Sequence, residues 1–199
     1  MAAHSAPPQV APIERRLAAI EAVLDERGVT AKDAVAELEH LALEEWLPQN
    51  GARVVAKAWT DPAFRVRLLA DGRAAVAELG LTMPRHHRHL VVLENTPTVQ
   101  NVICCTLCSC TAFTIVGLPP DWYKDLEYRA RVVRQSRTVL REMGLDLPPK
   151  VEIRVWDTTA DTRYMVLPVQ PAATIGWSEA ELAGIVTRDS LIGVARLQE

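Results

Sequence analysis

The chain has 199 residues, of which 49% are hydrophobic and 24% charged, and its formal net charge is −3. This length and apolar content suit a globular protein with a buried core, whereas so small a charge excludes the strongly basic surface typical of nucleic-acid-binding proteins. No apolar run reaches the length of a membrane span and the N-terminus has no signal-peptide segment, so we expect a cytoplasmic protein with neither a nucleic-acid nor a membrane partner.

The first part of the chain is predicted to be helical. Residues 1–12 are rich in Ala and Pro and lack periodicity, so we expect a flexible segment there. A helical region should then occupy residues 13–80. Apolar residues recur at helical spacing over residues 13–27, and Gly28 should end this first helix.

Three more helices are expected before residue 80. Thr30 with Asp33 resembles a capping box that opens a helix ending before Pro48. A third helix is expected after Gly51. Asp61 should cap a fourth, because a proline follows it at the first helical position, where the missing N–H costs little.

The second part, residues 81–199, reads as mixed strands and helices. Short β-rich runs at residues 90–93 and 102–103 predict strands, and the second leads directly into a cluster of cysteines. A helical first third followed by such a region predicts an α+β fold.

Further elements are expected after the cysteines. Residues 119–143 read as a helical stretch opened by two prolines. Residues 151–156 alternate as a strand, and residues 163–167 are its expected hairpin partner. Ser178 with Glu181 predicts a capping box that opens a late helix.

All four cysteines lie within seven residues, from Cys104 to Cys110. Neighbours this close make poor disulfide partners, and a bridge between them would connect no distant parts of the chain. The spacing of Cys105, Cys108 and Cys110 can instead direct three sulfurs toward one point, which suits a transition metal. Cys104 should point to the opposite face of a strand and be a buried structural thiol.

The run Cys105-Thr-Leu-Cys-Ser-Cys110 resembles the metal "claw" of nitrile hydratase α subunits, a motif shared with thiocyanate hydrolase. The resemblance extends over roughly residues 50–195. It is carried by segments 58–62, 117–120, 122–124, 128–134, 163–168 and 176–178.

This resemblance implies a set of ligands for Co(III) or Fe(III). They are the sulfurs of Cys105, Cys108 and Cys110 and the deprotonated amide nitrogens of Ser109 and Cys110. It also implies that Cys108 is oxidised to a sulfinate and Cys110 to a sulfenate, and that these two act in catalysis. Thr106 is typical of the cobalt branch, where the iron branch has Ser, so we expect one cobalt per chain rather than iron.

The resemblance further implies helical N-terminal arms followed by an α–β–β–α layered domain, with the claw loop at a strand end. The expected reaction is hydration of a nitrile to its amide. It needs a β-type partner subunit, single or split, and an activator protein that delivers cobalt. Whether the sulfenate oxygen or a metal-bound hydroxide attacks the nitrile stays open.

Two departures from the family pattern concern the substrate pocket. His86 stands where the family has Gln, within a histidine- and arginine-rich run that reads either as a solvated loop or as a segment facing the site. Phe113 replaces a family Trp, and Thr114 replaces Pro. These changes predict a pocket for a bulky heteroaromatic nitrile, as in the branch of the family that hydrates the nucleoside nitrile toyocamycin.

Two other interpretations remain at this stage. The chain could be a subunit of the thiocyanate hydrolase type, which has the same claw and another substrate. It could also be a non-catalytic zinc-binding module that uses Cys105, Cys108 and a histidine between residues 86 and 89.

Overall fold

The structure, a computed structural model, describes residues 11–197 and divides into two compact units, one up to Leu41 and one from Ala42 onward. The segment expected to be flexible, 1–12, lies outside the described residues except for its last two. The helical region expected over residues 13–80 is divided between the two units. Among residues 11–197, no helix is both long enough and apolar enough to cross a membrane.

The first unit contains helices α1 (Ile13–Glu26) and α2 (Ala31–His40), and Leu41–Glu45 continues as a π-helical turn. Gly28 ends the first helix with a φ of +70°, as expected. The Thr30 hydroxyl accepts a hydrogen bond of 3.0 Å from the backbone N–H of Asp33, which confirms Thr30 as the cap. No side chain of α1 or α2 is buried, so their apolar stripes face outward.

The second unit begins with three helices, α3 (Pro48–Thr60), α4 (Pro62–Ala70) and α5 (Gly72–Glu78). Asp61 caps α4 as predicted. The expectation that the third helix follows Gly51 was wrong, because α3 begins at Pro48 and Gly51 lies inside it. A Cβ at Gly51 would lie 2.7 Å from the Leu191 side chain. This glycine therefore permits close packing inside α3 and does not mark where the helix begins.

Four strands form two parallel pairs: β1 (His89–Glu94) with β4 (Thr162–Leu167), and β2 (Val99–Cys104) with β3 (Glu152–Asp157). The expected hairpin between residues 151–156 and 163–167 was therefore wrong. The link after Asp157 crosses from one sheet to the other, and so does the link between β1 and β2.

The pairing has a physical reason in the length and composition of the links. Residues 158–161 are Thr-Thr-Ala-Asp and lack the Asn-Gly or Asp-Gly turn that fixes a tight hairpin. The connection from β2 to β3 is instead a long crossover that carries helices, which is what parallel pairing requires. It contains α6 (Phe113–Val116), α7 (Asp121–Lys124) and α8 (Leu126–Glu142), the last kinked at Gln135.

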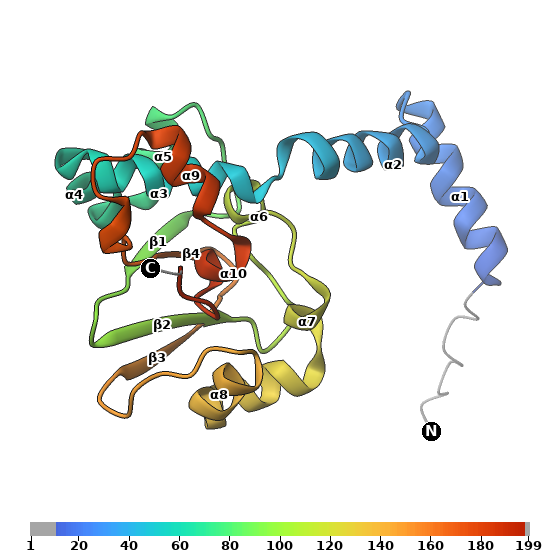
Figure 1. Cartoon of the computed structure of the whole chain (residues 1–199). Helices are drawn as coiled ribbons and strands as arrows, with labels where there is room; N and C mark the ends of the chain where they lie inside the picture. The colour runs from blue at the N-terminus through green and yellow to red at the C-terminus, as the bar shows by residue number, and fades with distance from the viewer. Residues whose placement is uncertain (1–10, 198–199) are drawn as a thin grey trace, which may run out of the picture. The chain divides into compact units, whose positions relative to one another are not determined.

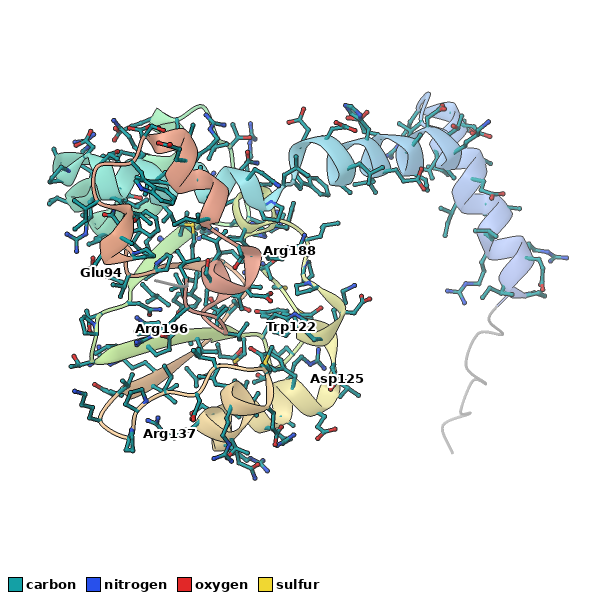
Figure 2. The ribbon with its side chains drawn as sticks, in the orientation of Figure 1. Glu94, Trp122, Asp125, Arg137, Arg188 and Arg196 are labelled. Atoms are coloured by element: carbon teal, nitrogen blue, oxygen red, sulfur yellow. The ribbon has the colours of Figure 1, made fainter. Side chains whose placement is uncertain are left out.

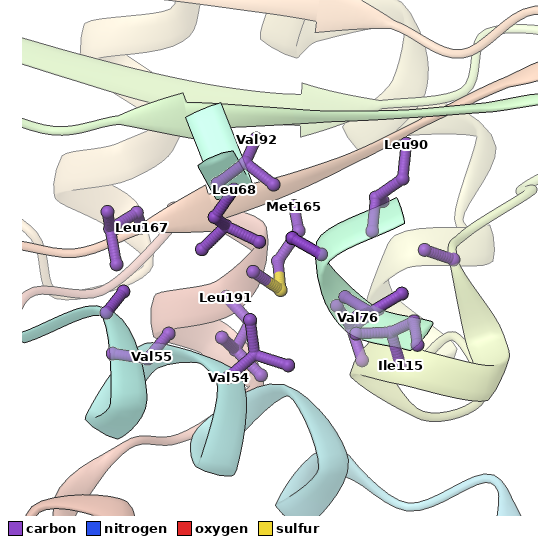
Figure 3. Close-up of a cluster of buried hydrophobic side chains, with 14 of the residues drawn as sticks. Val54, Val55, Leu68, Val76, Leu90, Val92, Ile115, Met165, Leu167 and Leu191 are labelled. Carbon is purple, nitrogen blue, oxygen red and sulfur yellow. The ribbon is translucent and has the colours of Figure 1, made fainter. Parts of the chain in front are cut away.

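The second unit has the layer order helix, sheet, sheet, helix (Figure 1). Helices α3, α4 and α5 cover the β1–β4 pair together with α10 (Arg188–Ile192), α9 (Glu179–Ile185) packs on α3, and α8 packs on β3. One apolar cluster, shown in Figure 3, lies between the first helices and β1–β4, and a second joins β2 to α8. The α+β class and the α–β–β–α layers are thus confirmed, and the predicted capping box at Ser178 opens α9.

Candidate metal centre

Three cysteine sulfurs converge directly after strand β2, in the loop of residues 105–110, which we call the claw. The Sγ atoms of Cys105 and Cys108 are 3.6 Å apart, and those of Cys108 and Cys110 are 2.8 Å apart. All three sulfurs lie within 4.8 Å of one another. Within residues 11–197, this convergent group of potential metal ligands contains cysteines alone, which disfavours the zinc module with histidine ligands.

The entry to the claw is fixed by the end of strand β3. Thr158 donates its backbone N–H to the Cys104 carbonyl at 3.0 Å, which extends the β2–β3 ladder by one residue. The carboxylate of Asp157 then accepts hydrogen bonds from the backbone N–H of Thr106, at 2.9 Å, and from its hydroxyl. The claw therefore leaves the sheet in a defined direction.

Ser109 gives the claw its turn. Its φ is +73°, and it is the one non-glycine residue with positive φ among those that the structure describes. Residues rarely adopt this conformation unless the surrounding structure holds it, and such residues cluster at functional sites. Here the turn separates Cys108 from Cys110 and brings both sulfurs to the same side of the loop.

Two buried tyrosines donate hydrogen bonds to backbone carbonyls, one at the end of the claw and one in strand β2 before it. The Tyr123 hydroxyl donates to the carbonyl of Cys110 at 3.1 Å, and the Tyr128 hydroxyl donates to the carbonyl of Ile103 at 3.1 Å. Burial, together with neighbouring ionisable groups, raises the pKa of both phenols well above the ordinary range. Both hydroxyls therefore remain donors.

The cysteine thiols differ in their acidity. Burial would raise the pKa of Cys105, but the adjacent Thr158 hydroxyl and the backbone N–H groups of the claw outweigh it and lower this pKa to about 6. Burial and the neighbouring Cys108 raise the pKa of Cys110 to about 12. In the metal-free chain, Cys105 is thus more acidic than an ordinary thiol and Cys110 less acidic.

Cys104 does not belong to the convergent group. It is fully buried at the end of β2, and burial and the nearby Asp157 raise its pKa to about 12. The prediction of a buried structural thiol is confirmed.

A hollow of about 310 Å³ opens over the claw. Its walls include three claw residues, Cys108, Ser109 and Cys110, and four side chains from elsewhere: His86, His87, Phe113 and Arg163. Cys105 lies beneath, only 2% exposed. The structure thus brings together all the residues that the sequence pointed to as ligands or pocket residues.

The histidine-rich run is partly solvated and partly built into the site. His86 is exposed, whereas His87 is 2% exposed and its ring meets the Phe113 ring at a centroid distance of 5.3 Å. Phe113 in turn contacts Trp46 edge-on at 4.7 Å. The Arg73 guanidinium donates to the carbonyls of Met83, Pro84 and His87, which fixes the loop. The run is therefore in part a solvated loop and in part a segment that faces the site, so each of the two interpretations applies to some of its residues.

Arg163 is a buried cation in the wall of the hollow. It is 4% exposed, its Nη1 donates to the carbonyls of Thr159 and Thr162, and its Nε has no partner. Within the described residues it forms no ion pair with a carboxylate. A buried charge is costly unless it is paired, so this guanidinium suits a site that carries negative charge.

Sequence reasoning did not assign roles to Asp157, Tyr123 and Arg163. Arg163 lies near the start of β4, and the burial of a charged side chain there is unusual, but only the structure shows that burial. Asp157 and Tyr123 come from segments distant in sequence from the claw, and nothing in local spacing connects them to it.

The residues of the claw fit a soft transition metal. Three convergent sulfurs form a thiolate-rich donor set, and one of them has a lowered pKa. The family resemblance adds two backbone amides to this set, and the Ser109 turn lies between two of the sulfurs. Cys105, Cys108 and Cys110 would hold the ion, with the amide nitrogens of Ser109 and Cys110.

Comparison with known proteins agrees with this geometry. The family model described as "Nitrile hydratase, alpha chain" matches residues 11–195. The low-molecular-weight cobalt-containing nitrile hydratase subunit alpha of Rhodococcus rhodochrous is 49% identical over 183 residues, 92% of this chain and 88% of that protein.

Solved structures are similar over nearly the whole chain. An Fe-type nitrile hydratase from Comamonas testosteroni Ni1, studied as a double mutant, has a TM-score of 0.85 and 59% identity over 93% of this chain and 90% of that one. A recombinant thiocyanate hydrolase with partially modified cobalt centres has a TM-score of 0.81 and 40% identity, covering 96% and 92%. The family match, the shared fold and the convergent cysteines lead to one conclusion: this chain belongs to the nitrile hydratase α-chain family.

Proposed function

We propose that this chain is the metal-bearing subunit of an enzyme that hydrates nitriles to amides. The observation that carries the proposal is the convergence of three cysteine sulfurs beneath a hollow, in a chain that the family matches over residues 11–195. When bound, a trivalent ion would supply Lewis acidity to polarise the nitrile.

The chain's own residues prepare the site. The Cys105 thiolate, with its pKa near 6, supplies the first anionic ligand. Oxidation of Cys108 to a sulfinate and of Cys110 to a sulfenate reduces sulfur donation and adds negative oxygens. The buried guanidinium of Arg163 lies in the wall of the same hollow and offsets part of that negative charge.

Cobalt is the metal we propose, one ion per chain. Thr106 follows the first ligand as in the cobalt branch, and the 49% identical Rhodococcus relative is named as cobalt-containing. Iron is the second candidate, because the Fe-type structure from Comamonas testosteroni Ni1 has the higher identity, 59%.

Metal analysis with intact mass tests these assignments. The chain is co-expressed with its β-type partner in medium containing both cobalt and iron, and the active assembly is purified. We expect one cobalt per chain and three added oxygens, two on Cys108 and one on Cys110. Stoichiometric iron in place of cobalt would assign the second candidate, iron, as the metal. Stoichiometric zinc, or unmodified thiols at both cysteines in active enzyme, would contradict the proposed centre.

We further propose that a β-type subunit, single or split, completes the site. Leu107, at the tip of the claw, is 85% exposed, and apolar residues of α1 such as Ile13 (72% exposed) and Ile20 (58% exposed) face outward. Large apolar side chains left exposed on each unit are candidates for contact with a partner. An activator protein should deliver the cobalt. The isolated chain, loaded with metal, should have far less activity than the assembly, and equal activity would refute the need for a partner.

The proposed substrate is a bulky heteroaromatic nitrile, such as a cyano-deazapurine nucleoside. The hollow over the claw is lined by Phe113, where the family pattern noted in the sequence has Trp, and by the His86 ring, which can stack on or hydrogen-bond to a heteroaromatic ring. The assay compares kcat/KM for the nucleoside nitrile with that for acetonitrile. A preference for acetonitrile would exclude this substrate class and would not contradict the proposal that the enzyme hydrates nitriles. Turnover of thiocyanate in preference to any nitrile would instead assign the chain to the hydrolase type.

A further inference from the structure

The exit half of the claw is held from outside by very few bonds. Within the described residues, the hydrogen bonds of Cys108 and Ser109 stay inside the claw. The bond from the Tyr123 hydroxyl to the Cys110 carbonyl, 3.1 Å long, is the one that reaches residues 107–110 from elsewhere. The entry half, by contrast, has the two bonds from Thr106 to Asp157.

The Tyr123 phenol is itself rigidly placed. It is completely buried in α7, and its ring packs against Trp122 at a centroid distance of 5.8 Å and against Tyr128 at 6.0 Å. Trp122 also contacts Tyr128 edge-on at 5.0 Å. Figure 2 labels Trp122 on α7, close to Asp125, which caps α8. This aromatic trio leaves the hydroxyl little freedom.

The hydrogen bond supports the uncommon conformation of Ser109. A residue with positive φ relaxes to negative φ unless its neighbours on both sides are restrained. On the far side of Ser109 that restraint is the Tyr123 bond, because Cys110 carries the carbonyl that it holds. Relaxation at Ser109 would rotate the peptide that links it to Cys110, and with it the Cys110 sulfur and amide nitrogen.

We propose that Tyr123 is a positioning residue for the metal claw: its hydroxyl fixes the Cys110 carbonyl and so keeps the Cys110 sulfur and amide directed toward Cys105 and Cys108. The role deepens the proposed function, since it concerns the same metal centre. Tyr123 does not line the substrate hollow, and its hydroxyl bonds to the backbone carbonyl of the claw, so it acts through the backbone.

The chain offers a matched control in Tyr128. Its buried hydroxyl makes the same kind of bond, of the same length, to the carbonyl of Ile103. Ile103 lies inside β2, where pairing with β3 already holds the backbone. Tyr123→Phe and Tyr128→Phe therefore each remove one buried hydrogen bond, and only the first releases the claw.

The first test uses cadmium on the full chain, purified without cobalt under reducing conditions, so that it does not depend on nitrile chemistry. Cadmium binding to three thiolates is followed by its thiolate-to-metal absorption. We expect Tyr123→Phe to weaken cadmium binding about tenfold, the scale on which residues that orient metal ligands act, and Tyr128→Phe to leave it near the wild-type value. Both variants should show comparable falls in Tm, since each loses one buried hydrogen bond.

The second test uses the cobalt-loaded assembly with the β-type partner. Tyr123→Phe should shift the thiolate-to-cobalt absorption, speed metal loss to a chelator and lower kcat about tenfold with KM little changed. Tyr128→Phe should retain the wild-type spectrum. Equal effects of the two variants on cadmium affinity, or no effect of either, would overturn the positioning role. If the cadmium results hold while the wild-type assembly hydrates no nitrile, the proposed function fails and the role of Tyr123 in the claw stands.

Discussion

Replacing Gly193 with alanine should destabilise the fold through a clash with strand β2. Gly193 follows α10 with a φ of +92°, and a Cβ there would lie 1.9 Å from the carbonyl oxygen of Asn101. That oxygen cannot easily retreat. The Asn101 backbone N–H donates to Asn95 at 2.7 Å, and the Asn101 side chain accepts from Trp156 at 2.9 Å.

The size of the effect follows from two contributions. An alanine in the left-handed region costs about 1–2 kcal/mol, offset by about 0.4–1 kcal/mol from the stiffer unfolded chain. Forcing a methyl group into packed structure adds about 1–3 kcal/mol. We therefore expect Gly193→Ala to lower the free energy of unfolding by about 1–5 kcal/mol.

Gly144 provides the control that separates these contributions. It follows α8 with a φ of +94°, and no atom lies within 4 Å of a Cβ placed there. Gly144→Ala should therefore cost only the backbone part, about 0–1.6 kcal/mol. Urea unfolding of the full chain gives both values from the shift in midpoint at a constant m-value. Equal losses for the two variants would refute the clash, and with it the tight seating of α10 on β2.

Three further outcomes are expected. Burial first, then Arg163 and neighbouring cations, holds the pKa of His87 at about 4, below its ordinary 6.5. As the pH drops from 6.5 to 4, the unfolded metal-free chain gains a proton at His87 while the folded chain does not, which lowers the free energy of unfolding by at most about 3 kcal/mol. His87→Gln should reduce the pH dependence measured by urea titration across that range by this contribution. Phe113→Trp should lower kcat/KM for a nucleoside nitrile more than for acetonitrile, and an equal loss for both would show that this position does not set substrate size. Asp157→Asn should increase the rate of cobalt loss to a chelator about tenfold, because the Thr106 anchor weakens, whereas Glu152→Gln at the other end of β3 should not.

Much of the fold could be predicted from local patterns in the sequence. Helix caps at Thr30, Asp61 and Ser178 and the strand that runs into the claw were all apparent, because caps and alternation depend on near neighbours. The strand pairing was not, since two strands separated by four residues suit a hairpin as well as a link between sheets. What decides between them is the burial of β2 along nearly its whole length, which depends on the complete fold.

The same limit applies to the metal centre. The spacing of Cys105, Cys108 and Cys110 pointed to the ligands, and the structure brings these sulfurs together. Asp157 and Tyr123 could not be assigned, because each reaches the claw only after distant segments have packed. Local spacing therefore indicates the ligands, and tertiary contacts supply what orients them.

The exposed helices of the first unit have a consequence for how the chain survives in a cell. Helices α1 and α2 have 14 and 10 residues and bury no side chain. Isolated helices of this length are marginal in water, so their persistence should depend on the concentration of whatever covers their apolar stripes. If the proposed β-type partner covers these stripes, a chain made in excess of that partner would offer proteases an exposed N-terminal segment, and the unassembled chains would be removed by degradation.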